Sequence, residues 1–168
     1  MYIYYIGFPL LLLAAIIDAS VLVQIRYLNG QPALLLMLVI SWALLNDLPE
    51  SLPWAVMGGI FADLLSVSLL GPSSLALVIA VVIVSAIFGQ ISRRNLVIPP
   101  LSIALATMVY QSVWLVLVIL TTGRSIPIPG AVVNWMLPSV VFNFLGILIV
   151  FRIMGTLAEF FRAPAAAL

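Results

Sequence analysis

Apolar residues occur in six long runs along the chain, and short segments with charged residues, glycine, proline or asparagine separate the runs. A helix needs about 20 predominantly apolar residues to span a membrane. The sequence therefore predicts six membrane-spanning helices, joined by short connections that make neighbouring helices mostly antiparallel. The second run is short, so the second and third runs could also form a shorter, tilted or re-entrant pair. The predicted spans are Ile3–Val23, Gln31–Leu45, Pro53–Leu70, Ser73–Gln90, Val97–Leu120 and Asn134–Phe151.

The boundaries of these spans follow from residue type. The segment 46–50 is predicted as a loop because it contains Pro49, and Ser73 or Ser74 is predicted to cap the fourth helix. Beyond the sixth span, four apolar residues share one helical face, which predicts an amphipathic helix at the membrane surface that ends at Pro164. The chain thus divides into a six-helix transmembrane domain, residues 1–152, and a cytoplasmic amphipathic tail, residues 153–168. The four apolar residues are Ile153, Leu157, Phe160 and Phe161.

Composition places the chain among integral membrane proteins. Hydrophobic residues make up 65% of the 168 residues and charged residues 7%, with a mean hydropathy of +1.36, whereas a soluble domain carries about 25% charged residues. The predicted fold class is therefore all-α and polytopic. The absence of cysteine and histidine excludes disulfides, thiol nucleophiles, imidazole bases and the usual zinc ligands. Because the usual catalytic motifs are missing and the five acids are scattered, the sequence predicts no catalytic site, no metal and no cofactor. No nucleic-acid partner is predicted either.

Orientation follows from the placement of the arginines, which are the only basic residues. With six spans and a cytoplasmic N-terminus, four arginines lie on the cytoplasmic side, and Arg26 and Arg124 lie outside. This excess favours cytoplasmic N- and C-termini by the positive-inside rule. The four arginines that are predicted to anchor the cytoplasmic side are Arg93, Arg94, Arg152 and Arg162.

Asp63 is the most unusual residue of the chain because it lies ten positions into the predicted third span. An aspartate at the centre of a membrane helix costs about 2.5–3.5 kcal/mol on insertion scales. A residue retained at that cost serves packing, binding or folding. We expect Asp63 to be structural first, bonded to a neighbouring helix or to a backbone group of the outer connections.

Small residues form a stripe beside Asp63 on the same predicted helix. Their spacing of four, three and four residues places them on one face, and such faces let another helix backbone approach closely in a membrane. The stripe either packs the core of the monomer or binds a partner helix. On the second interpretation, Gly59→Leu separates the partner without unfolding the bundle. The stripe consists of Ala55, Gly59, Ala62 and Ser66.

Three further polar residues in the predicted spans suggest a network. Asp18 lies near the outer end of the first span, flanked by Ala15 and Ala19, while Gln111 and Asn143 lie within the fifth and sixth spans. Polar residues at such positions usually form hydrogen bonds between helices worth under about 2 kcal/mol each. We favour this packing role for Gln111 and Asn143, and we interpret Asp18 as a near-terminal acid that partly reaches the membrane interface. The alternative is a small-molecule cavity lined by Asp63, Gln111 and Asn143.

The stretch from Trp54 to Gly71, which contains Gly58-Gly59-Ile60-Phe61-Ala62-Asp63-Leu64-Leu65-Ser66, resembles the rod shape-determining membrane protein family MreD. The size, the six-helix layout and the basic loop after the fourth helix are also similar, so the resemblance covers most of residues 10–152. It implies a bundle like that of the substrate-binding S components of energy-coupling-factor vitamin transporters.

The resemblance also implies a function. It suggests a multi-pass scaffold of the bacterial inner membrane that binds the bitopic protein MreC. That scaffold would connect MreB filaments with the peptidoglycan synthase RodA and its class B penicillin-binding transpeptidase partner. A second copy of the chain is a further candidate partner. The alternative function is that of an S component itself, with Ala15 and Ala19 as the docking motif and a polar vitamin held by outer groups. Those groups would be Arg26, Asn29, Arg124 and Asn134.

Overall fold

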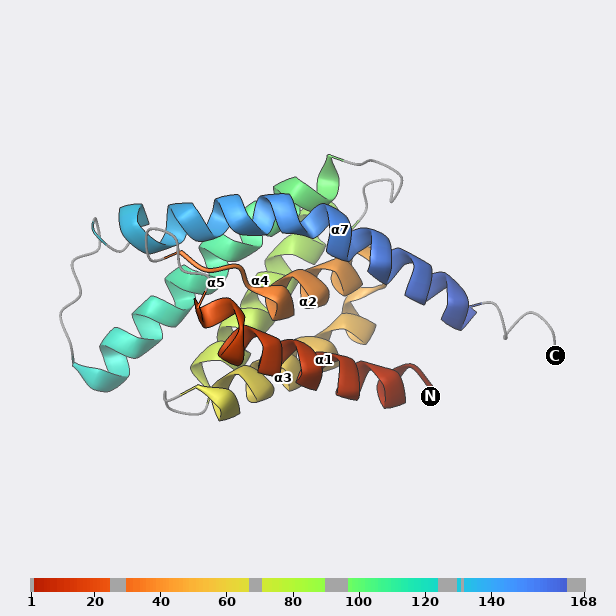
Figure 1. The fold of residues 1–168 in the computed structure, drawn as a ribbon, viewed down its shortest axis with the longest axis horizontal. Coiled ribbons are helices and arrows are strands. Elements are labelled where there is room, and N and C mark those ends of the chain that lie inside the picture. Colours follow the sequence, from red (N-terminus) through yellow and green to blue (C-terminus); the bar gives the residue numbers. More distant parts are fainter. Residues whose placement is uncertain are drawn as a thin grey trace.

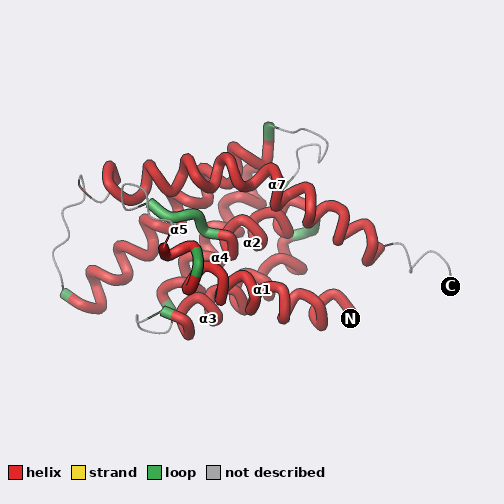
Figure 2. The backbone as a smooth tube through the Cα atoms, in the orientation of Figure 1, coloured by secondary structure: helices red, strands yellow, loops and turns green. Residues whose placement is uncertain are grey.

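The computed structural model describes residues 2–24, 30–66, 71–89, 97–123, 130 and 132–162. Over this part of the chain every regular element is helical, as Figure 2 shows, which agrees with the predicted all-α class. The elements are α1 (Tyr2–Ser20), a short 3₁₀ turn η1 (Leu22–Gln24), α2 (Leu34–Leu45), α3 (Leu48–Leu65), α4 (Pro72–Phe88), α5 (Ile98–Thr122), a π-helical turn η2 (Val132–Met136) and α7 (Leu137–Arg162).

Length and hydropathy single out two segments that are long and apolar enough to cross a membrane, Ile98–Thr122 and Asn134–Glu159. Three shorter apolar helices accompany them, at Gly7–Ser20, Leu34–Leu45 and Pro72–Phe88. Six complete spans therefore stay a prediction. The antiparallel course of successive helices is visible in Figure 1, where α1 begins and α7 ends at the same end of the bundle.

The central helix of the bundle is α2. Its residues 35–44 are all buried, because α1, α3, α4, α5 and α7 pack around it (Figure 1). An apolar helix that is covered on all sides by protein has no lipid-facing stripe to display. This position explains how a helix of 12 residues, shorter than a membrane is thick, fits inside the bundle.

The start of α3 differs from the prediction. The helix begins at Leu48 rather than Pro53, and it includes Pro49, which was expected to mark a loop. Proline is tolerated in the first turn of a helix because the amide hydrogens there have no partner within the helix. At its other end α3 stops at Leu65, since Ser66 is already extended, rather than continuing to Leu70.

The last helix, α7, continues through Arg152 without a break and ends at Arg162. In its last turns the residues that face the core are Met154 and Ala158, which are 1% and 4% exposed, whereas Ile153 is 54% exposed. Of the apolar face predicted at the membrane surface, Ile153 is exposed and Leu157 packs partly buried against the core. The side chains of Phe160 and Phe161 lie outside the described set. The division into a 1–152 domain and a cytoplasmic tail stays a prediction, and Pro164 lies outside the described residues.

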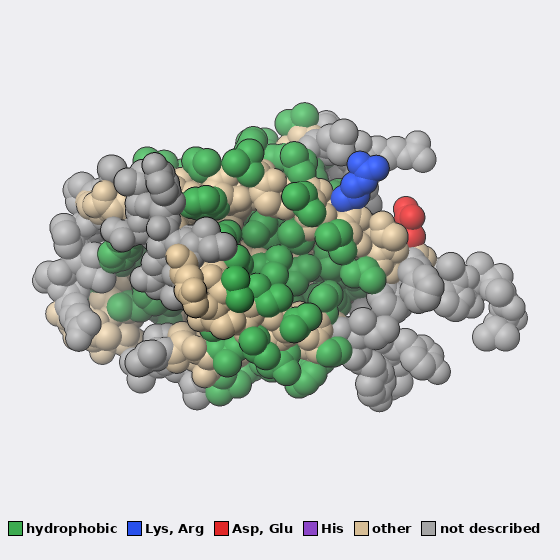
Figure 3. All heavy atoms as spheres, in the orientation of Figure 1, with side chains coloured by type: hydrophobic (Ala, Val, Ile, Leu, Met, Phe, Trp, Pro, Cys, Tyr) green, Lys and Arg blue, Asp and Glu red, His purple; other side chains and the backbone are tan. Residues whose placement is uncertain are grey.

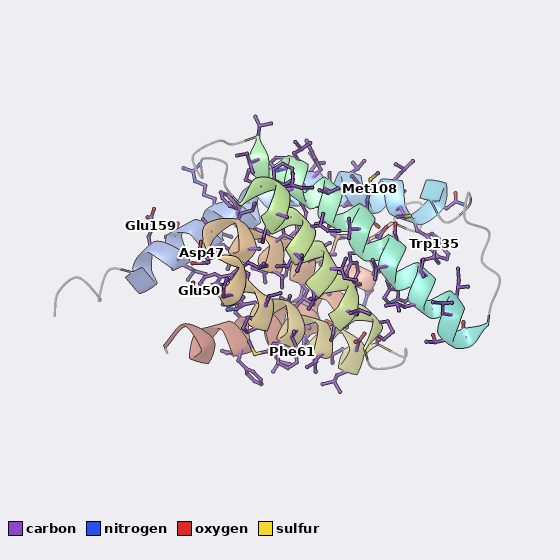
Figure 4. All side chains as sticks on the ribbon, turned by 180° about the vertical axis from the view of Figure 1, so that it is seen from behind. Asp47, Glu50, Phe61, Met108, Trp135 and Glu159 are labelled. Carbon is purple, nitrogen blue, oxygen red and sulfur yellow. The ribbon has the colours of Figure 1, made fainter. Side chains whose placement is uncertain are left out.

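Apolar side chains cover much of the described surface in Figure 3. On α3 and α7 the outward residues Leu64, Leu145 and Ile149 are each more than half exposed, as expected of positions that face lipid. Figure 4 shows Asp47, Glu50 and Glu159 at the end of the bundle where α7 ends, while Trp135 lies toward the other end. These charged residues therefore gather at one end of the bundle.

Candidate functional site

Asp63 is a buried hydrogen-bond acceptor for the start of the next helix. The Gly71 N–H donates to its Oδ2 (2.7 Å), the Ser73 N–H to its Oδ1 (3.1 Å) and the Ser74 N–H to its Oδ2 (3.4 Å). These groups are among the amide hydrogens that a helix leaves without an internal partner at its N-terminus, and Pro72 between them has none to offer. The bond to a backbone group of the connection, expected from the sequence, is confirmed. The carboxylate, which is 2% exposed, caps α4.

Asp18 is used in the same way on α2. The Leu34 N–H donates to its Oδ1 and the Leu35 N–H to its Oδ2, each at 2.9 Å. Asp18 lies two residues before the end of α1 at Ser20, as Asp63 lies two residues before the end of α3. In both helix pairs an acid at the end of one helix therefore caps the helix that follows.

Neither capped helix has a local cap to replace these acids. The N-cap positions are Ala33 for α2 and Gly71 for α4, and neither makes a side-chain hydrogen bond to its helix. The predicted capping of the fourth helix by Ser73 or Ser74 is wrong, because the helix already begins at Pro72. Gly71 has a φ of 120°, which L side chains rarely adopt, so the turn that brings the amides to Asp63 requires glycine here.

Asn143 on α7 holds the segment that precedes α2. Its Oδ1 accepts the Ala33 N–H (2.8 Å), and its Nδ2 donates to the Thr107 Oγ1 on α5 (3.0 Å). The Thr107 hydroxyl in turn donates to the Ile103 carbonyl (2.7 Å). One turn earlier on α7, the Ser139 Oγ accepts the Gln31 N–H (3.2 Å). Asn143 and Thr107 are fully buried, so this chain of bonds ties α5 and α7 to the entrance of α2 inside the bundle.

These contacts define a polar layer at the end of the bundle where α1 and α3 end. Its members are Asp18, Asp63, Thr107, Ser139 and Asn143, together with the helix starts that they bind. Of the predicted network, the structure places Asp18 and Asn143 on adjacent amides of one segment. Gln111 does not join them, since its buried Oε1 has no partner within the described structure.

Sequence reasoning missed Tyr110 in this layer. Its side chain hydrogen-bonds the Ser73 side chain and lies within electrostatic range of both Asp63 and Asp18. It is therefore near both capping acids. Tyr110 lies three residues after Thr107, so both side chains lie on one side of α5. This spacing is the sequence feature that could have predicted Tyr110 in the polar layer.

The residues of the small-residue stripe differ in burial, so they do not all face the same surroundings. Ala55 is fully buried, Ala62 is partly buried and Ser66 is exposed. A Cβ atom at Gly59 would overlap the backbone of Ser74 on α4. The expectation that bulk at Gly59 separates a partner and leaves the bundle intact is therefore wrong, because the close neighbour of Gly59 belongs to the same chain.

The predicted anchoring arginines are only partly described. Arg152 is exposed on α7, the side chain of Arg162 lies outside the described set, and Arg93 and Arg94 fall in the undescribed segment 90–96. In the described residues no three of the histidine, cysteine, aspartate and glutamate side chains come together as a metal site would require.

Comparison with known families gives one match. The family model described as rod shape-determining protein MreD matches residues 1–161. No curated protein and no solved structure matches the chain.

Proposed function

Since the chain belongs to the MreD family of rod shape-determining membrane proteins, we propose that it is a non-enzymatic scaffold of the bacterial cell-elongation machinery. In this proposal it lies in the inner membrane with both termini in the cytoplasm, binds the transmembrane helix of MreC, and links MreB filaments to RodA and its class B transpeptidase partner. Membership in the family supports a role in rod shape determination. The partners and the topology are part of the proposal.

One observation supports a scaffold over a carrier of small solutes. The acceptor groups of Asp18, Asp63 and Asn143 are each occupied by backbone N–H groups of the same chain. A carrier needs polar groups that exchange their partners when a solute binds and leaves. Groups that already satisfy helix starts would expose unpaired amides on such an exchange, which is costly inside a membrane. The polar layer is therefore suited to holding the helices in a fixed arrangement.

The alternative is an S component of an energy-coupling-factor vitamin transporter. Of its proposed docking pair, Ala15 is buried and Ala19 is exposed at the end of α1. Of its proposed vitamin-binding groups, Asn134 is exposed, whereas Arg26, Asn29 and Arg124 lie outside the described residues.

Copurification separates the two functions. The chain is co-expressed with tagged MreC, extracted in a mild detergent and passed over the tag resin, and we expect a stable complex. A single-pass membrane protein of unrelated sequence with the same tag is the control. If the chain does not copurify with MreC but retains a water-soluble vitamin through purification, the scaffold function is refuted and the carrier function is favoured.

Disulfide cross-linking can then find the face that binds MreC, because the native chain has no cysteine. Single cysteines at exposed Ile60 on α3, Met108 on α5 and Leu145 on α7 sample three outward faces, and buried Ala80 is the matched control. Paired with cysteines along the MreC helix, one outward position should cross-link strongly. Equal cross-linking at Ala80 would indicate unfolded protein rather than a complex.

A further inference from the structure

The second half of α5 has little contact with the rest of the bundle. Seven of the eight buried residues of this helix lie between Ile98 and Thr107, and Leu115 is the eighth. Every other residue from 108 to 122 is at least partly exposed. In Figure 1 this end of α5, drawn in cyan, projects beyond the neighbouring helices. It therefore presents a helix face that the described chain itself does not cover.

Two polar residues lie in the middle of α5. Gln111 and Ser112 follow Ile98 by 13 and 14 residues, in an apolar span of 25 residues that ends at Thr122. This places them close to the centre of a hydrocarbon layer about 30 Å thick. Ser112 is exposed, and Gln111 is partly exposed, with no hydrogen-bond partner for its Oε1 in the described structure. Lipid tails neither donate nor accept, so polar groups at this depth are stabilised by bonding to another helix.

Ser112 lies at the centre of an exposed apolar face. The residues of this face, which we call the α5 face, are spaced three, four, four and three apart, so they share one side of the helix. Met108 and Val116, one turn to either side of Ser112, are 42% and 54% exposed. A small residue between larger apolar ones lets a second helix backbone approach closely. The α5 face consists of Leu105, Met108, Ser112, Val116 and Ile119.

We propose that the α5 face binds the same face of a second copy of the chain. Two copies inserted in one membrane have the same orientation, so a twofold axis along the membrane normal brings identical residues together at the same depth. Ser112 then meets Ser112 of the partner subunit. A hydroxyl and a side-chain amide each donate and accept, so the contact is self-complementary. Gln111, at the edge of the face, is long enough to reach across to the partner subunit's hydroxyl.

Symmetry is the reason for choosing a second copy over another protein. The second copy necessarily carries an amide and a hydroxyl at the depth where Gln111 and Ser112 need partners. A helix of another protein meets this need only if it has a polar residue at that same depth. The pairing does not rest on the proposed scaffold function, since the outward faces of α3 and α7 stay free for other partners.

Cysteine cross-linking in native membranes tests the position of the contact. In the cysteine-free chain, a single cysteine replaces Met108 or Val116, and a membrane-permeant oxidant is added. We expect covalent dimers at both positions. Leu145→Cys is the matched control, because it is 64% exposed near the middle of the other long span, and its dimer should be lost. Equal dimer at all three positions would indicate random collision and overturn the proposal. Cross-linking of Met108→Cys to a cysteine in the MreC helix, and not to itself, would also overturn it.

Replacing the polar groups tests what holds the two copies together. Förster transfer between copies labelled at Gly155→Cys, where no described atom lies within 4 Å of a Cβ, measures dimer formation in mixed micelles. We expect Gln111→Leu to dimerise roughly 3- to 30-fold more weakly, as the loss of hydrogen bonds between membrane helices predicts. Its unfolding midpoint should not fall, because the Gln111 Oε1 has no partner within the described chain.

Ser112→Ala is the second variant, because it removes the central hydroxyl and keeps the residue small. It should weaken the dimer in the same direction even if Gln111→Leu fails to fold. A wild-type chain that stays monomeric at every concentration would overturn the proposal. Dimerisation of a folded Gln111→Leu or Ser112→Ala protein with the affinity of the wild type would show that these groups do not hold the copies together, and would overturn it as well.

Discussion

Replacing Asp63 tests the cap on α4 most directly. Three backbone N–H groups depend on its two oxygens, Gly71 and Ser74 on Oδ2 and Ser73 on Oδ1. In Asp63→Asn one oxygen becomes an NH₂ group. If the amide oxygen keeps the two bonds at Oδ2, the Ser73 N–H faces a donor and loses its partner. A buried donor left unpaired costs about 1–3 kcal/mol, so we expect Asp63→Asn to fold with a loss of about 1–3 kcal/mol.

Asp63→Leu removes all three bonds at once. Three unpaired donors cost roughly 3–9 kcal/mol if their contributions add, against a total stability of about 5–15 kcal/mol for a typical protein. We therefore expect Asp63→Leu to lose assembly or to unfold in mild detergent. Ser66→Ala is the matched control, because Ser66 is exposed at the same helix end and its hydroxyl donates to the Asp63 backbone carbonyl (3.1 Å) without contacting the carboxyl group that caps α4 in any printed bond. Its effect should stay within about 0.5 kcal/mol.

Unfolding by SDS titration in mixed micelles, followed by tryptophan fluorescence, measures these differences in free energy. The order wild type, Asp63→Asn, Asp63→Leu from most to least stable is the expected result. An Asp63→Leu protein as stable as the wild type would refute the capping role. An Asp63→Asn protein that is fully stable but cannot support rod shape would show that the carboxylate acts in binding or transport rather than in folding.

Of three further predictions, the first relies on the cysteine-free background, and the other two are measured by the same unfolding assay. An impermeant thiol reagent added outside intact cells should label a cysteine at Ser125 and not one at Asn95; the reverse pattern would contradict cytoplasmic termini. Gly59→Leu should destabilise the bundle because its side chain would overlap the Ser74 backbone, whereas Gly155→Leu should be tolerated, since no described atom lies within 4 Å of a Cβ there. Asn143→Leu leaves the Ala33 N–H unpaired and should cost about 1–3 kcal/mol; an unchanged unfolding midpoint would show that this bond contributes little.

The class of the protein and its main helices could be predicted from the apolar runs and their breakers. Runs of apolar residues between breakers place the fifth helix at Val97–Leu120, close to the observed Ile98–Thr122, because no soluble surface or other regular structure suits such a run. The same argument predicts a structural or functional role for Asp18, Asp63 and Asn143, because a polar group in a membrane helix is retained only where it has a partner. Composition and spacing sufficed for these inferences.

The identity of the partners came only from the tertiary structure. Asp18 bonds to amides 16 and 17 residues ahead, and Asn143 bonds to an amide 110 residues away. No local pattern contains these distances, because they depend on how the helices pack. The local sequence also gave a wrong prediction at Pro49, which indicated a loop. Pro49 instead lies in the first turn of α3, where its missing N–H costs nothing.

Gly59 shows the same limit for the small-residue stripe. Its spacing predicts a face that admits another backbone, and the structure confirms that a backbone lies against it. Whether that backbone belongs to a partner or to the chain itself depends on the course of the connection after Asp63, which turns at Gly71 and returns α4 against α3. Helical periodicity specifies which residues share a face, but the helix that meets this face is decided by the global packing of the bundle.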